Sequence, residues 1–196
     1  MTKEEVGNYL RITDFDDVIK SREEARSTSQ IVKFSVNHSK EGEYLIFIRE
    51  DGTYRIFNTL GDILYLLNRS DLFTLYSIVR ELYADQVATG LGLMLLGDLI
   101  IMMETEEDSS DQMWRNQDEW EIMLWRFNQS YGVHVLELEN GITIHMLADQ
   151  MYPLTVGLME RLLDHGLQVQ EESDGVADFV RWFLVKLDKN KDTNNM

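Results

Sequence analysis

The chain has no cysteine and only one proline among its 196 residues. The absence of cysteine excludes disulfide bonds, thiolate metal sites and cysteine nucleophiles, and it suits a reducing environment. The chain also lacks an apolar stretch at its start, because its first seventeen residues, MTKEEVGNYLRITDFDD, are charged where a signal peptide would be hydrophobic. We therefore expect an intracellular protein of the cytoplasm or nucleus.

Positive charge is scarce. Lysine and arginine number 18 against 35 aspartates and glutamates, which gives a net charge of −17. A surface that binds phosphates would have to be assembled against this negative field. We therefore do not expect a nucleic-acid partner, although RNA handling stays an alternative.

Long hydrophobic runs are also missing. The longest, residues 91–103 (LGLMLLGDLIIMM), spans thirteen residues and contains Asp98, whereas a membrane-spanning helix needs about 18 to 20 apolar residues. Its glycines do not form a phosphate loop, because a dinucleotide-binding motif would need glycine at Leu95 and a P-loop would need lysine in place of Asp98. We read this run as a buried helix and expect no membrane contact.

The remaining sequence predicts an α+β fold. Residues 1–28 form a charged, helix-compatible segment, residues 29–189 a single domain, and residues 190–196 a disordered tail. Branched and aromatic residues predict strands at 30–37, 43–50, 53–58, 119–128, 132–139 and 142–147. Apolar spacing predicts helices at 60–68, 71–83, 91–103, 154–163 and 176–189. We expect one antiparallel sheet of five to six strands covered by helices.

A faint internal repeat runs through this pattern. The order strand, tight turn, strand, helix occurs in YLIFIREDGTYRIF…SDLFTLYSIVREL and again in VHVLELENGITIHM…YPLTVGLMERLL. Each half turns on Asp-Gly or Asn-Gly, a strong hairpin signal. We hypothesise a duplicated hairpin-plus-helix unit, with both halves contributing strands to the same sheet.

The stretch HVLELENGITIH carries the most suggestive chemistry, because two histidines flank its turn. A two-residue turn at Asn140-Gly141 would place His134 and His145 on one face, about 7 to 8 Å apart. A zinc ion could bridge them, which keeps a metal-dependent hydrolase or nuclease as an alternative. Glu137 and Glu139 would point to the opposite face, so a structural or partner-facing histidine pair is the favoured interpretation.

Other motifs of catalysis or cofactor binding are missing. The acidic run at 104–112 has no glycine for a calcium loop, and there is no GxSxG or HExxH motif. We therefore assign no catalytic residue, no metal ligand and no cofactor. Trp182 and Val185 lie off the apolar stripe of the last helix, so they are candidates for a contact surface; partial burial beneath the N-terminal helices is the other interpretation.

Three longer strings carry a resemblance: EYLIFIREDGTYRIFNTLGDILYLLNRSDLFTLYSIV, LLGDLIIMME, and the stretch from MWRNQDEWEIMLWRF to VADFVRWF. Together they resemble a region of uncharacterised function in pol-type polyproteins of copia-like retrotransposons from daisy-family plants. The likeness spans residues 30–187, and 2–28 more weakly. The chain departs from the family's pattern at two places. It has Arg69-Ser70-Asp71 where the family typically has a "DR-D" helix start, and its Gly97-Asp98 pair lacks the preceding tryptophan.

The resemblance implies an element-derived module without catalytic function. The chain contains no protease Asp-Thr/Ser-Gly motif, no paired-aspartate polymerase motif and no His/Cys zinc set of an integrase. We therefore expect a protein interaction or assembly module that binds a protein partner or a second copy of itself.

Overall fold

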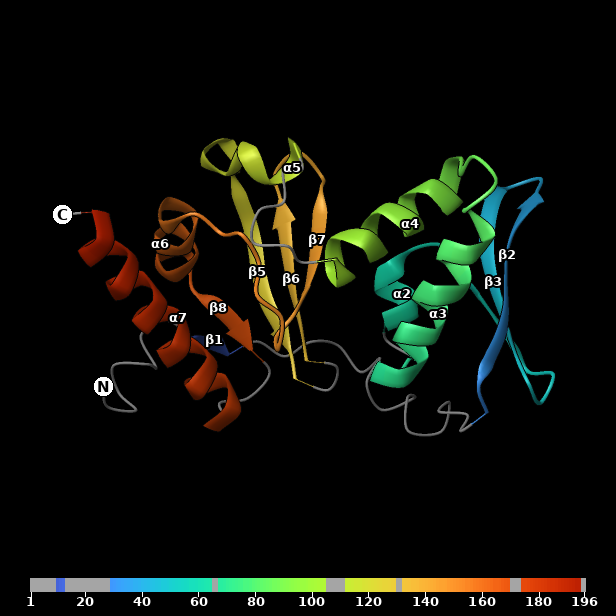
Figure 1. The fold of residues 1–196 in the computed structure, drawn as a ribbon, viewed down its shortest axis with the longest axis horizontal. Coiled ribbons are helices and arrows are strands. Elements are labelled where there is room, and N and C mark those ends of the chain that lie inside the picture. The colour runs from blue at the N-terminus through green and yellow to red at the C-terminus, as the bar shows by residue number, and fades with distance from the viewer. Residues whose placement is uncertain are drawn as a thin grey trace. The chain divides into compact units, whose positions relative to one another are not determined.

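The computed structural model describes residues 10–12, 29–64, 67–104, 112–129, 132–169 and 174–194. These residues form an α+β protein with two compact units: an N-terminal unit, residues 16–103, and a C-terminal unit, residues 1–15 with 104–196 (Figure 1). The predicted α+β class is confirmed, but the prediction of one sheet is wrong. The described strands form one sheet of three and another of five, so each unit has a sheet of its own.

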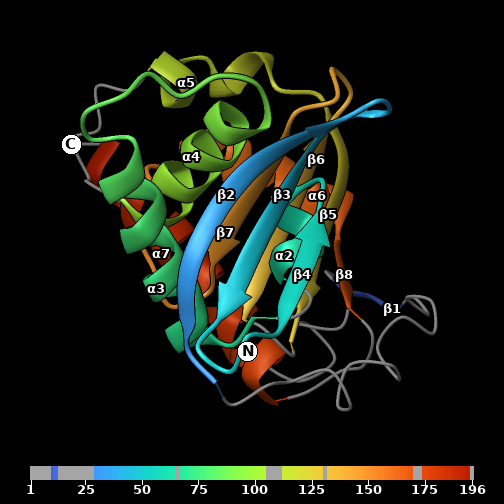
Figure 2. The same ribbon diagram turned by 90° about the vertical axis from the view of Figure 1, so that its right-hand side faces the viewer.

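The N-terminal unit is an antiparallel sheet in the order β2-β3-β4, with helices on one face (Figure 2). Its elements are β2 (Ile31–Ser39), β3 (Gly42–Arg49), β4 (Tyr54–Phe57), α2 (Leu60–Leu64), α3 (Arg69–Leu82) and α4 (Gly90–Met103). Alternate residues of β3 point inward, so Leu45 and Phe47 are buried together with Leu75 of α3 and Leu99 of α4. The predicted buried helix at 91–103 is thus half right: α4 buries one stripe and exposes Leu93.

A buried ion pair joins the sheet of this unit to α3. Arg49, the last residue of β3, donates two hydrogen bonds to the Asp71 carboxylate, at 2.8 and 3.2 Å. The Arg49 guanidinium also donates to the carbonyl of Ser29, and both charged side chains are buried. Removing either partner would leave the other charge buried and unpaired, which would strongly destabilise the unit.

The C-terminal unit has the strand order β1-β8-β5-β6-β7. Its strands are β1 (Leu10–Ile12), β5 (Ile122–Asn128), β6 (Val133–Leu138), β7 (Thr143–Leu147) and β8 (Leu167–Val169). Its helices are α5 (Gln112–Arg115), the 3-10 helix η3 (Gln117–Glu119), α6 (Val156–His165) and α7 (Asp174–Asn194). Strands β5, β6 and β7 are antiparallel, whereas β8 runs parallel to both β1 and β5.

The ends of the chain differ from the sequence prediction where the structure describes them. Most of the predicted helical segment 1–28, with its acidic residues, lies outside the described residues, but 10–12 form strand β1 rather than helix. At the other end, α7 continues to Asn194, beyond the predicted domain end at residue 189.

Whether residues 29–189 unfold as one cooperative domain stays a prediction. No helix within the described ranges is both long and apolar enough to cross a membrane.

The two hairpins share one turn geometry. In each, the last residue of the first strand donates its N–H across the turn, Arg49 to the carbonyl of Thr53 and Leu138 to that of Ile142. The third loop residue is glycine with a positive φ, +81° at Gly52 and +84° at Gly141. This likeness of Glu-Asp-Gly and Glu-Asn-Gly supports the duplicated hairpin, which stays a hypothesis. The two copies do not share a sheet, so that part of the hypothesis is wrong.

Candidate functional site

The hairpin of β6 and β7 does not place its two histidines on one face. The loop contains three residues, and its register pairs Val135 with His145 and His134 with Met146. Paired residues share a face and neighbours alternate, so His134 and His145 point to opposite faces of the sheet. The predicted shared face is wrong. A two-residue turn would need positive φ at Asn140 as well as at the glycine, and Asn140 does not adopt it.

His145 shares its face with Arg126, the residue of β5 in the same row as Val135. Burial and the nearby Arg126 guanidinium lower the pKa of His145 to about 4. The Arg126 side chain in turn forms an ion pair with Glu137 at 3.2 Å. Because the two imidazoles lie on opposite faces of the sheet, they do not hold an ion together. The described residues contain no cluster of three or more His, Asp or Glu side chains with metal-binding geometry.

His134 lies on the helix-facing side of the sheet, within a stack of aromatic rings. Its ring centroid is 4.1 Å from that of Phe179 on α7 and 4.5 Å from that of Phe127 on β5. Trp125 lies 6.0 Å away on the same side. The imidazole is 3% exposed, so it is part of the core between α7 and the sheet.

This imidazole has no polar compensation within the described chain. Neither of the His134 ring nitrogens has a hydrogen-bond partner there. Burial among the rings lowers its pKa to about 3, because the charged form would lose its hydration. His134 is therefore neutral at physiological pH and presents one unused N–H donor and one unused acceptor nitrogen.

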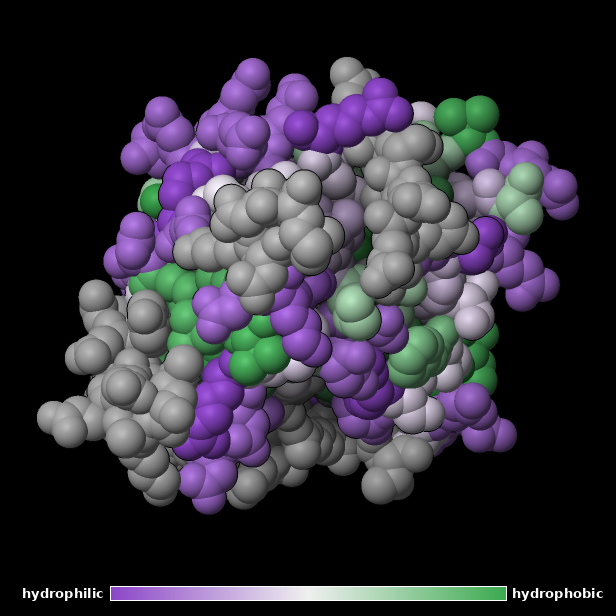
Figure 3. All heavy atoms as spheres, turned by 60° about the vertical axis from the view of Figure 1, so that its left-hand side comes forward, coloured by the Kyte–Doolittle hydropathy of each residue, from purple (hydrophilic) through white to green (hydrophobic). Residues whose placement is uncertain are grey.

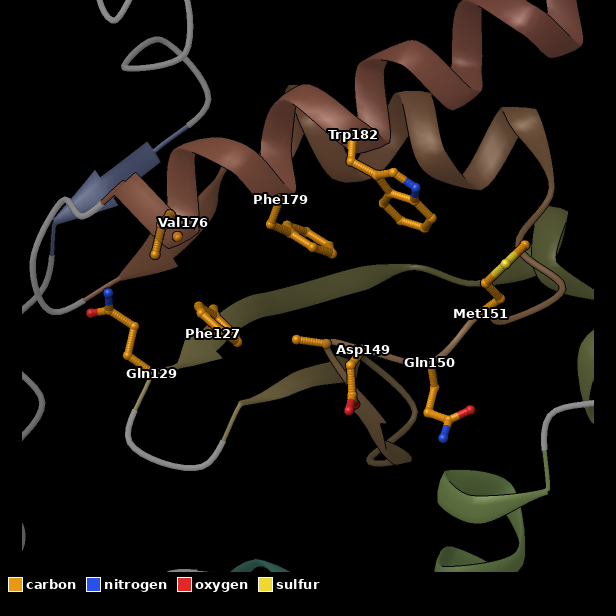
Figure 4. Close-up of a pocket in the computed structure, with 10 residues that line it drawn as sticks. Phe127, Gln129, Asp149, Gln150, Met151, Val176, Phe179 and Trp182 are labelled. Atoms are coloured by element: carbon orange, nitrogen blue, oxygen red, sulfur yellow. The ribbon is translucent and has the colours of Figure 1, made fainter. Parts of the chain in front are cut away.

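Beside this stack, the C-terminal unit has an open pocket of about 650 Å³ (Figure 4). One wall is apolar: Val176, Phe179 and Trp182 project from α7 toward the segment that follows β7 (Figure 4). The opposite wall includes Asp149 and Gln150, whose side-chain ends point away from α7 (Figure 4). The remaining lining residues are Phe127, Gln129, Ala148, Met151 and Gly175. An amphipathic cavity of this size suits ligand binding.

Two side chains fix the segment that carries Asp149 and Gln150. Tyr152 accepts a hydrogen bond from the backbone N–H of Leu147, at 2.7 Å, through its hydroxyl oxygen. The buried Gln117 amide donates to the carbonyl of Pro153 at 2.6 Å and accepts from the N–H of Thr155 at 2.8 Å. The segment is thus tied to the fold immediately beyond the pocket, which preorganises the wall.

A second, smaller cavity of about 30 Å³ lies over His134. Gln150, Phe179 and Trp182 line both this cavity and the larger pocket. Other neighbours of the small cavity include Tyr152 and Lys186. Its volume matches about one water molecule or one hydroxyl group.

The two predicted surface residues of α7 differ in their surroundings. Trp182 is 43% exposed and lines the pocket, and the Lys186 ammonium lies 5.4 Å from its ring centroid. Val185 is 50% exposed but does not line it. Figure 3 shows hydrophobic side chains at the surface on the side where α6 and α7 lie, bordered by hydrophilic ones. The predicted covering by the N-terminal helices lies outside the described residues.

Sequence reasoning named Trp182 but missed most of the pocket. Gln129, Gln150 and Met151 lie at strand ends and in a connection, where no periodicity marks them. Phe179 is half-buried and also lines the pocket. Comparison of the chain with protein-family models, with curated proteins and with solved structures finds no match in any of the three.

Proposed function

We propose that this chain is a non-enzymatic interaction module whose pocket beside α7 receives an apolar segment of a protein partner. The observation that carries the proposal is the amphipathic pocket of about 650 Å³, with Phe179 and Trp182 on one wall and Asp149 and Gln150 on the other. Aromatic residues and methionine are enriched at protein interfaces, and the exposed Trp182 and Met151 stand at this pocket.

The charge of the unit indicates a basic partner. Residues 1–15 and 104–196 contain 22 acidic and only 9 basic residues, so most of the negative charge belongs to the unit with the pocket. Lysine or arginine flanking an apolar anchor would be attracted to this unit and would speed association. The same field disfavours RNA, whose backbone is negatively charged. A retrotransposon origin, as the resemblance implies, would suit an assembly role and stays a prediction.

The proposal can be tested before the partner is identified. A random peptide library is selected on the full chain, and individual enriched peptides are measured by fluorescence polarisation. We expect peptides with an aromatic or aliphatic anchor between basic residues. Their affinity should fall at least tenfold in Trp182→Asp, because the substitution removes an apolar wall and adds a charge.

Val185→Asp is the matched control, since it places the same charge on the exposed side of the same helix outside the pocket. It should retain nearly the affinity of the unchanged protein. Equal loss in both variants would point to a general charge effect. Peptides that bind Trp182→Asp as tightly as the unchanged protein would refute the pocket as the binding site.

A further inference from the structure

His134 is a polar residue where the other unit has an ordinary core residue. Counted from the turn glycine, His134 stands seven positions before Gly141, and Leu45 stands seven positions before Gly52. Both side chains are buried on the helix-facing side of their hairpins, and Leu45 is 2% exposed. Leucine therefore fits such a position, and the fold does not need the hydrogen-bonding groups that the imidazole adds.

These groups are unused in the free protein. Both ring nitrogens are buried without a partner among the described residues, and the residue lines the small cavity. An unsatisfied buried donor destabilises a protein by about 1 to 3 kcal/mol. A ligand group that enters the cavity and hydrogen-bonds one of these nitrogens would relieve part of this cost on binding.

The cavity restricts what that group is. At about 30 Å³ it has room for about one water-sized group, so a hydroxyl fits it better than a carboxylate or a phosphate. Because a hydroxyl can donate as well as accept, it can hydrogen-bond either the N–H or the unprotonated nitrogen of a neutral imidazole. Lys186 also lines the cavity, and its ammonium can donate to a hydroxyl oxygen but not receive a proton from one.

The larger pocket indicates what carries the hydroxyl. Phe179 and Trp182 line both spaces, so the two are neighbours, and a planar aromatic body packed against these rings would direct its tip toward the small cavity. We infer that the partner's anchor is a tyrosine, whose ring occupies the large pocket and whose hydroxyl enters the small cavity and hydrogen-bonds His134. This inference rests on the proposed function and adds the identity of the anchoring side chain.

A matched pair of small probes tests it. N-acetyl-tyrosinamide and N-acetyl-phenylalaninamide differ by the hydroxyl alone, and their dissociation constants are measured by ligand-observed NMR on the full chain. We expect the tyrosine probe to bind about three- to tenfold more tightly, the value of one buried hydrogen bond. In His134→Leu this preference should vanish, because the partner of the hydroxyl is gone. In His145→Leu, which alters the opposite face, it should persist.

Each outcome is decisive. Equal affinity of the two probes for the unchanged protein would overturn the tyrosine inference, whatever the variants do. Binding that is still lost in Trp182→Asp would then leave the proposed function standing. Failure of both probes to bind, or binding unaffected by Trp182→Asp, would remove the pocket and both proposals with it.

Discussion

Replacing His134 by leucine should stabilise the free protein. The imidazole is buried between Phe127 and Phe179 with both nitrogens unpaired, so it carries the desolvation penalty of a lost hydrogen bond. Leucine has a similar volume and no polar atom, and Leu45 occupies the corresponding position of the other hairpin. We expect the free energy of unfolding at pH 7 to rise by about 1 to 3 kcal/mol.

The gain should grow in acid. The folded protein holds the pKa of His134 at about 3, against 6.5 for an unperturbed histidine. The unfolded chain therefore binds this proton more readily, so the titration of His134 costs no stability above pH 6.5 and lowers the free energy of unfolding increasingly as the pH falls toward 3. At pH 4.5, two units below 6.5, this loss is roughly 3 kcal/mol. His134→Leu does not suffer it.

Urea unfolding of both proteins at several pH values between 4.5 and 7.5, followed by tryptophan fluorescence, measures the difference. His145 titrates in the same direction because its pKa is also lowered, but it is present in both proteins and cancels. His38→Leu serves as the control for loss of an exposed imidazole, since that side chain is 73% exposed. A His134→Leu protein that is less stable at pH 7, or whose advantage does not grow in acid, would refute the account of His134 as an uncompensated neutral imidazole.

Two further predictions concern the fold. Asp71→Asn should lower the free energy of unfolding in the same urea assay by about 3 to 5 kcal/mol, because Arg49 would stay buried without a counter-charge. The double variant Arg49→Met/Asp71→Leu should recover much of that stability. A loss below about 1 kcal/mol in Asp71→Asn would contradict the importance of the ion pair. Gly141→Ala should lower the melting temperature, since φ is +84° there, at a cost of about 1 to 2 kcal/mol. Gly97→Ala, within α4 and with open space around the added methyl group, should instead be neutral or stabilising, so equal effects of the two would count against the turn geometry.

Sequence periodicity located most of the long elements, because the apolar residues of β2, β3, β5 and α7 repeat at intervals that burial imposes. It did not find β1 and β8, since three residues are too few to show an alternation. It also did not divide the strands between two sheets. That division depends on which strands pair, and pairing is decided by long-range contacts that a local pattern does not contain.

The histidine pair shows how one residue of register changes a functional hypothesis. The Asn-Gly dipeptide correctly predicted the turn, but the loop has three residues rather than two, and every side chain of β7 consequently moves to the other face. His134 and His145 thus changed from a candidate metal pair into residues on opposite faces. The pocket itself was out of reach of the sequence, because its walls come from β5, the segment after β7, and α7.

The most direct test of the central claim is to observe the pocket residue during binding. All four tryptophans, at 114, 120, 125 and 182, lie in the C-terminal unit, and only Trp182 lines the large pocket, while Trp114 and Trp120 pack against each other elsewhere. In protein labelled with 5-fluorotryptophan, fluorine NMR gives one signal for each. On titration with N-acetyl-tyrosinamide, the Trp182 signal should shift most and that of Trp125, beside the small cavity, less, while the other two should stay in place. Saturable binding that leaves the Trp182 signal unchanged would contradict the pocket beside α7 as the binding site.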